Sequence, residues 1–200
     1  MWPLTPLQAG LLFHATVAEE SVDAYMVQLV LDLGGQVDPA RLRRAGQTLL
    51  DRHPNLRASF VTDTDTGPVQ VITDHLEAPW SELDLSGLDE PARDREFDRL
   101  MTTDRATRFD PAHAPLLRWM LVTLTPEHSR LVLTNHHLLL DGWSTPLLLK
   151  ELLVAYATNS DTTILPTVAP YRDFLAWLVG QDRAASLGVW AGVFDGVDEP

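Results

Sequence analysis

Two apolar segments that lie close together in the sequence place the strongest constraint on the fold. Residues 116–124 (LLRWMLVTL) and 130–134 (RLVLT) carry hydrophobic side chains at nearly every position. A strand with one face in water alternates hydrophobic and polar residues, so this pattern is typical of strands buried on both faces. We therefore expect both segments in the interior of a β-sheet.

Helices and further strands are expected around this sheet. Asp38 and Pro39 resemble an N-cap and first-turn pair, and apolar residues follow at helical spacing. The expected helices are 5–18, 38–53, 91–105, 144–156, 171–181 and 186–194, and the strands are 24–33, 57–62, 68–73, a short stretch near Trp80, 116–124 and 130–134. Segments 57–62 and 68–73 are expected to form a hairpin, and the charges of helix 91–105 to lie at the surface. The order favours the α/β (α+β) class, as a two-layer sandwich of a mixed β-sheet and helices.

The charge of the chain excludes several classes of partner. Its 28 acidic residues outnumber its 15 basic residues, which gives a formal net charge of -13. A phosphate backbone repels such a chain, so we expect neither nucleic acid nor an anionic membrane as a partner.

No apolar run reaches the ~20 residues that cross a bilayer, and the N-terminus does not resemble a signal peptide, so a cytoplasmic location is expected. The absence of Cys excludes thiol nucleophiles and zinc–thiolate sites.

The candidate chemistry lies in the segment NHHLLLDGW, which directly follows the apolar strands. It contains the pattern HHxxxDG, formed by His136, His137, Asp141 and Gly142. An imidazole titrates near neutral pH, so it can accept a proton from an attacking amine or hydroxyl. A carboxylate can orient that ring or pair with a buried Arg, and a glycine lets a main-chain N–H approach a developing oxyanion. These residue types point to acyl transfer.

The same segment has other interpretations. A metal site needs a third and a fourth ligand, and two adjacent His side chains diverge in an extended segment, so we expect no metal. A serine hydrolase is disfavoured because the chain has no GxSxG motif. A pair of core histidines with a purely structural role stays open at this point.

Four ordered segments resemble motifs of the condensation domains of nonribosomal peptide synthetases, within the chloramphenicol acetyltransferase-like superfamily. They are PLTPLQAGLLFH at 3–14, RHPNLRASF at 52–60, NHHLLLDGWS at 135–144 and YRDFLAW at 171–177. The resemblance implies a chloramphenicol acetyltransferase-like fold. It also implies that residues 1–200 form the N-terminal lobe of such a domain, with the C-terminal lobe absent.

The resemblance further implies a role for each residue of the pattern. His137 is expected to be catalytic, and Gly142 to lie at the mouth of the substrate channel and offer its N–H. Asp141 is expected to be structural and paired with Arg57, and His136 to be a packing residue. The implied reaction is attack by the α-amine of a downstream aminoacyl thioester on an upstream peptidyl or aminoacyl thioester. Both are held on phosphopantetheine arms of upstream and downstream peptidyl carrier proteins, so this chain is expected to bind no cofactor itself.

Finer expectations rest on the same resemblance. The run from Gln8 to His14 and the form DGWS are similar to domains that take a D-configured donor. The lobe alone is expected to be inactive. One alternative is an HHxxxDG acyltransferase that uses coenzyme A, which the segments YRDFLAW and RHPNLRASF disfavour. The other is a non-catalytic domain of this fold that recruits partners, which the intact HHxxxDG pattern disfavours.

Overall fold

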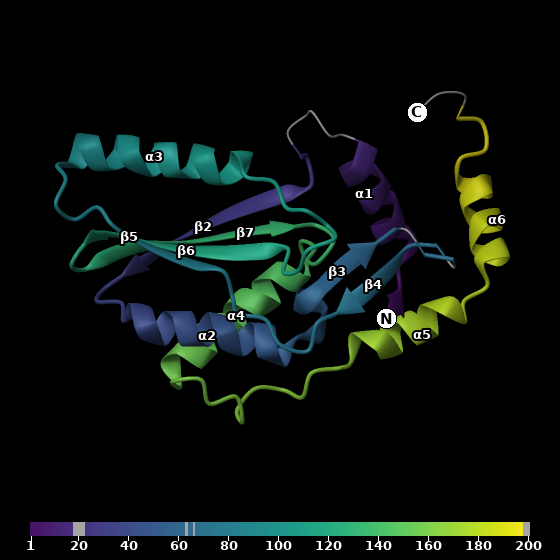
Figure 1. Cartoon of the computed structure of the whole chain (residues 1–200). Coiled ribbons are helices and arrows are strands. Elements are labelled where there is room, and N and C mark those ends of the chain that lie inside the picture. Colours follow the sequence, from purple (N-terminus) through teal and green to yellow (C-terminus); the bar gives the residue numbers. More distant parts are fainter. Residues whose placement is uncertain (18–22, 63, 66, 198–200) are drawn as a thin grey trace. The chain divides into compact units, whose positions relative to one another are not determined.

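The chain forms two compact units, Met1–Val168 and Ala169–Pro200 (Figure 1). The computed structural model describes residues 1–17, 23–62, 64–65 and 67–197. The first unit carries every described strand and helices α1 to α4, and the second carries α5 (Tyr171–Val179) and α6 (Arg183–Val193). None of the helices in these ranges is long and apolar enough to cross a membrane.

The larger sheet of the first unit has four strands in the order β2–β7–β6–β5. Their bounds are Met26–Gly34 for β2, His128–His136 for β7, Leu117–Thr125 for β6 and Trp80–Asp84 for β5. β7 is antiparallel to both of its neighbours, whereas β5 is parallel to β6. The sheet is therefore mixed, as the sequence predicted, and its middle strands are the two apolar segments.

Helices cover both faces of this sheet, which explains why its middle strands are apolar at nearly every position. α2 (Pro39–Arg52) and α4 (Ser144–Ala157) pack on one face, and α3 (Glu90–Ala106) packs on the other (Figure 1). Successive strand residues point to opposite faces, so Leu131 and Leu133 of β7 join the core under α2 and α4, whereas Val132 joins the core under α3. The expected α/β class is confirmed.

The predicted hairpin is present, but it belongs to a second, smaller sheet. After the short 3₁₀ helix η1 (Pro54–Arg57), β3 (Ala58–Val61) pairs with β4 (Val69–Ile72), and β1 (Trp2–Pro3) pairs with the other edge of β4. The two-residue strand β1 was not predicted, because so short a segment has no readable periodicity.

Helix α1 (Pro6–Val17) packs against both the smaller sheet and the segment that follows β7. Leu12 of α1 and Phe60 of β3 form one buried cluster with Leu116, just before β6, and Leu138, just after β7. All four side chains are at most 2% exposed. This cluster fixes the position of the chain where the HHxxxDG pattern begins.

The second unit is held by local contacts. In α5 the rings of Tyr171, Phe174 and Trp177 stack successively, with centroids 5.7 and 5.8 Å apart. The carboxylate of Asp182 caps α6 by accepting the N–H of Ala185 at 2.9 Å. Both expected helices of this region are therefore present.

Candidate active site

The HHxxxDG pattern lies in a tight turn between the central strand β7 and helix α4. His136 is the last residue of β7, and its N–H donates to the carbonyl of Leu116 at 3.0 Å. The N–H of Leu139 donates back to the carbonyl of His136 at 3.0 Å, which closes the turn. The turn is thus anchored on a fully paired strand, as placing a reactive group with precision requires.

His137 is the first residue of this turn, and both its main chain and its ring have hydrogen-bond partners. Its main-chain N–H donates to the carbonyl of Tyr25 at 2.9 Å. Nδ1 of the ring lies 2.9 Å from the carbonyl oxygen of Leu140. A carbonyl can only accept, so Nδ1 carries the proton and Nε2 of the neutral ring keeps its lone pair. The side chain is only partly buried, so Nε2 can act as a base toward a substrate.

His136 has the opposite environment. The residue is 0% exposed, and its Nδ1 accepts the N–H of Leu138 at 3.0 Å. Burial lowers the pKa of His136 below its ordinary value, against the opposing effect of the carboxylate of Asp23. The direction of this shift favours the neutral ring, and the ring is fully buried among the described residues.

Asp141 does not pair with Arg57, so this part of the expectation is wrong. The carboxylate of Asp141 accepts the main-chain N–H groups of Trp143 (3.1 Å) and Ser144 (2.7 Å) at the start of α4. These hydrogen bonds, Ser144 first, lower the pKa of Asp141. Helix starts leave N–H groups without acceptors, so Asp141 has the role of a helix cap. Asp141 is exposed.

Arg57 instead serves the end of helix α2. Its guanidinium donates to the carbonyls of Leu50 and Asp51 in the last turn of α2, and to the carbonyl of Thr73 at 2.8 Å. A cation at a helix C-terminus is favourable because the last carbonyls have no helical partner. The side chain therefore ties α2 to the segment after β4, and among the described residues no hydrogen bond or ion pair joins it to the HHxxxDG turn.

Gly142 is exposed, and nothing lies within 4 Å of the position that a Cβ would occupy. Its φ is outside the positive range in which glycine is favoured. Neither backbone strain nor packing within the described residues therefore requires a glycine here.

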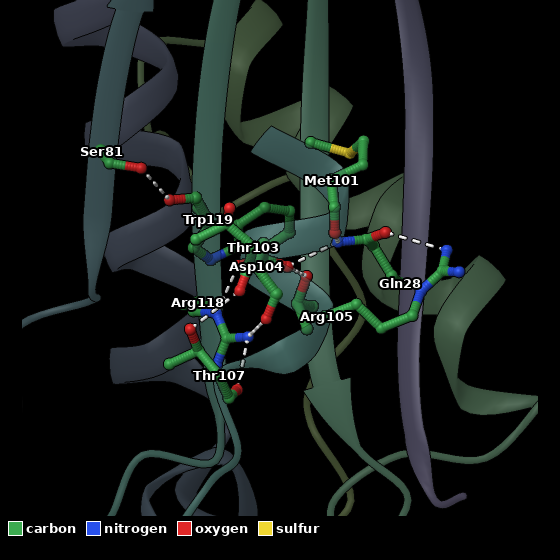
Figure 2. Close-up of polar contacts among 10 residues, drawn as sticks. Gln28, Ser81, Met101, Thr103, Asp104, Arg105, Thr107, Arg118 and Trp119 are labelled. Atoms are coloured by element: carbon green, nitrogen blue, oxygen red, sulfur yellow. Dashed lines mark hydrogen bonds and ion pairs between the residues drawn. The ribbon is translucent and has the colours of Figure 1, made fainter. Parts of the chain in front are cut away.

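A buried ion pair holds α3 against the strands that carry the site. Figure 2 shows Asp104 near the end of α3, where its carboxylate accepts from Nε of Arg118 and Nε2 of Gln28, both at 2.6 Å. It also accepts from the hydroxyl of Thr134, two residues before His136. Burial raises the pKa of Asp104, but the hydrogen bonds from these three residues outweigh it and hold the pKa below its ordinary value. Asp104 is 8% exposed, so the prediction that all charges of this helix lie at the surface is wrong.

Both the sequence and the fold of this chain are similar to those of known proteins. The Condensation domain family matches residues 1–199. The chain belongs to the condensation domain family. One linear gramicidin synthase protein of Brevibacillus parabrevis is 36% identical over 203 residues, which cover 100% of this chain and 4% of that protein. Bacitracin synthase 3 of Bacillus licheniformis is 32% identical over 201 residues, which cover 100% of this chain and 3% of that protein.

A solved structure supports the fold of this condensation domain chain. The starter condensation domain of rhizomide synthetase superimposes with a TM-score of 0.85 at 20% identity, over 100% of this chain and 49% of that chain. The chain thus spans about half the length of that solved relative and a small part of the curated ones. The resemblance to condensation domains of nonribosomal peptide synthetases is confirmed at the level of family and fold.

Three residues that hold the turn of this condensation domain were not predicted as site residues. Gln8 of α1 donates from Nε2 to the carbonyl of Leu138 at 3.0 Å. Asp23 and Tyr25 approach the turn from the segment that leads into β2. Gln8 lies in a recognised motif, but which carbonyl it reaches depends on long-range packing. Asp23 could be found only by knowing that β2 pairs with β7.

Proposed function

We propose that this chain is the N-terminal lobe of a condensation domain that joins two carrier-bound substrates by an amide bond. The observation that carries the proposal is the hydrogen bond from Nδ1 of His137 to the carbonyl of Leu140, which leaves Nε2 as the basic atom. Family membership and the match to about half of a solved condensation domain support the assignment.

The proposed reaction balances with His137 as the proton carrier. The acceptor amine attacks the thioester carbonyl of the donor, a C–N bond forms, and Nε2 of His137 takes the proton that the amine loses. Collapse of the tetrahedral intermediate breaks the C–S bond, and the thiolate of the donor's phosphopantetheine arm leaves. The imidazolium returns the proton to that sulfur, so the products are an amide and a free thiol. Gly142, whose surroundings are open, is proposed to let its N–H and the substrates approach each other.

The finer expectations belong to the same proposal. We propose a D-configured donor, upstream and downstream peptidyl carrier proteins as partners, a cytoplasmic location, and no cofactor bound by the chain itself. Both substrates then arrive activated as thioesters, so the chain needs no nucleophile of its own. We further propose that residues 1–200 alone do not turn over, because the exposed Gly142 and partly exposed His137 need a second lobe to enclose the substrates.

The test uses a complete condensation domain that contains this chain, with substrates loaded on their carrier proteins. His137→Ala is expected to lower the rate of amide formation by about 10²–10⁴-fold, as for the loss of a positioned acid–base group. His113→Ala is the matched control, because that ring is exposed and contacts Asp110 only on the surface. Equal rates for the two variants would contradict the proposal and favour a recruiting role. Faster reaction with coenzyme A thioesters than with carrier-bound ones would favour the coenzyme A acyltransferase.

A further inference from the structure

Asp23 is a buried carboxylate that no step of the proposed reaction uses. The residue is 7% exposed and lies just before β2. Its Oδ1 accepts the N–H of Tyr25 at 3.0 Å, and its Oδ2 lies 3.2 Å from Nε2 of His136. Burying a charged group is costly unless it is paired. A buried carboxylate with an N–H group opposite each of its oxygens therefore calls for a structural reason.

The ring of His136 links this carboxylate to the catalytic turn. Because Nδ1 accepts the N–H of Leu138, the single proton of the neutral ring lies on Nε2, the atom that faces Asp23. Nε2 makes no hydrogen bond among the described residues, and Oδ2 of Asp23 is the charged atom recorded near it, at 3.2 Å. The carboxylate of Asp23 therefore lies where it favours a proton on Nε2, the same tautomer that the N–H of Leu138 requires.

The same short segment also holds His137 directly. The carbonyl of Tyr25 accepts the main-chain N–H of His137 at 2.9 Å. Residues 23–25 therefore contact both histidines, His136 through a side chain and His137 through the main chain. We refer to Asp23, Tyr25 and His136 together as the histidine clasp.

We propose that Asp23 is a positioning residue for His137, acting through the ring of His136 on the turn that carries the catalytic side chain. The consequence for turnover rests on the role proposed above for His137. Asp23 holds the proton on Nε2 of His136, which leaves Nδ1 free to accept from Leu138. That hydrogen bond and the one from Gln8 to the carbonyl of Leu138 together hold both main-chain polar groups of Leu138, the residue that follows His137.

An amide of the same size cannot replace this carboxylate. Both oxygens of Asp23 face N–H donors, one on Tyr25 and one on His136. An Asn side chain offers one oxygen and one NH₂ group, so one of the two donors must meet another donor. If the NH₂ group faces His136, the ring has to move its proton to Nδ1, where it opposes the N–H of Leu138. Asp23→Asn is therefore a nearly isosteric substitution with a specific expected defect.

Tautomer-sensitive ¹⁵N NMR of the imidazole rings in the 200-residue chain tests the clasp without any turnover. In the parent we expect His136 protonated on Nε2 and His137 protonated on Nδ1. In Asp23→Asn we expect His136 to lose its single tautomer, and the amide of Leu138 to exchange with solvent at least about tenfold faster. Asp161→Asn is the matched control: it also removes a carboxylate that accepts a main-chain N–H, that of Thr163, but on the surface. The control is expected to leave both rings unchanged.

The parent spectrum decides even if Asp23→Asn does not fold, since a proton on Nδ1 of His136 at pH 7 overturns the inference. Unchanged tautomers in a folded Asp23→Asn overturn it as well. In a complete condensation domain, Asp23→Asn is expected to lower kcat about tenfold or more with little change in the KM for the carrier-bound donor. If the parent domain forms no amide, the proposed function is wrong. The NMR experiment still tests the histidine clasp in that case, because it needs no turnover.

Discussion

Replacing Asp104 by Ala tests how much the ion pair between Asp104 and Arg118 contributes to stability. The substitution removes the only carboxylate that Nε of Arg118 contacts in the described residues. It also deprives the hydroxyl of Thr134, a residue 1% exposed, of its acceptor. Nε2 of Gln28 keeps one partner, the carbonyl of Met101 at 3.2 Å.

The expected loss of unfolding free energy depends on the interactions that Arg118 keeps in Asp104→Ala. Breaking a buried pair by removing one partner costs about 3–5 kcal/mol. The guanidinium still donates to the carbonyls of Asp104 and Thr107 and lies 4.5 Å from the ring centroid of Phe109, so its charge is not left wholly unpaired. We therefore expect the low end, about 3 kcal/mol, which lowers Tm by about 6–12 °C in a chain of this size.

Urea unfolding and thermal melting of the 200-residue chain measure this loss. Glu96→Ala is the control on the same helix, since it removes an exposed pair with Arg99 and is expected to melt like the parent. Adding Arg118→Met to Asp104→Ala is expected to recover stability, because no unpaired charge is then buried. If Asp104→Ala and Glu96→Ala unfold at the same urea concentration, the ion pair contributes nothing and the reasoning is refuted.

Three further outcomes are expected. Asp141→Ala should lower the free energy of unfolding by about 0.5–2 kcal/mol, the cost of a helix cap, and a loss near ~4 kcal/mol in urea unfolding would instead indicate a buried partner. Gly142→Ala should leave the Tm of the chain unchanged, since a Cβ meets open space, but should slow amide formation in a complete domain; a lowered Tm would contradict this. Because burial lowers the pKa of His136, the unfolded state binds the extra proton, so stability falls as the pH drops below about 6.5, by at most about 1.4 kcal/mol per pH unit. Urea midpoints from pH 8 to pH 5 measure this slope, and His136→Gln should flatten it.

The sequence predicted best those elements whose own residues carry a clear local pattern. The segments 116–124 and 130–134 became β6 and β7 because alternate residues face helices on opposite sides, which removes any need for polar positions. α2 was equally clear, since Asp38 caps it by accepting the N–H of Arg41. The sequence did not show that β1, β3 and β4 form a second sheet, because no local pattern indicates which other strands a hairpin will pair with.

The sequence predicted the two histidines of the candidate site, but it did not predict the residues that hold them in place. His136 and His137 follow an apolar strand, and that placement is readable from neighbouring residues. The pairing of Asp141 with Arg57 was wrong because each side chain finds main-chain partners near itself, Asp141 at the start of α4 and Arg57 at the end of α2. Asp23 and Asp104 look like surface carboxylates, and only their distant partners His136 and Arg118 explain why they are buried.

The unbroken pairing of β7 with β2 restricts how sequences of this kind can change length over evolution. β7 is in register with β2 from His128 to His136, and β6 pairs with it as far as Asn135. Losing or gaining one residue inside this strand would exchange its two faces and carry the ring of His136 away from Asp23. A change of length at Pro126 or Glu127, between β6 and β7, leaves that register intact. Descendants of such a chain can therefore drift in length at the hairpin tip, whereas the path to His137 keeps a fixed residue count.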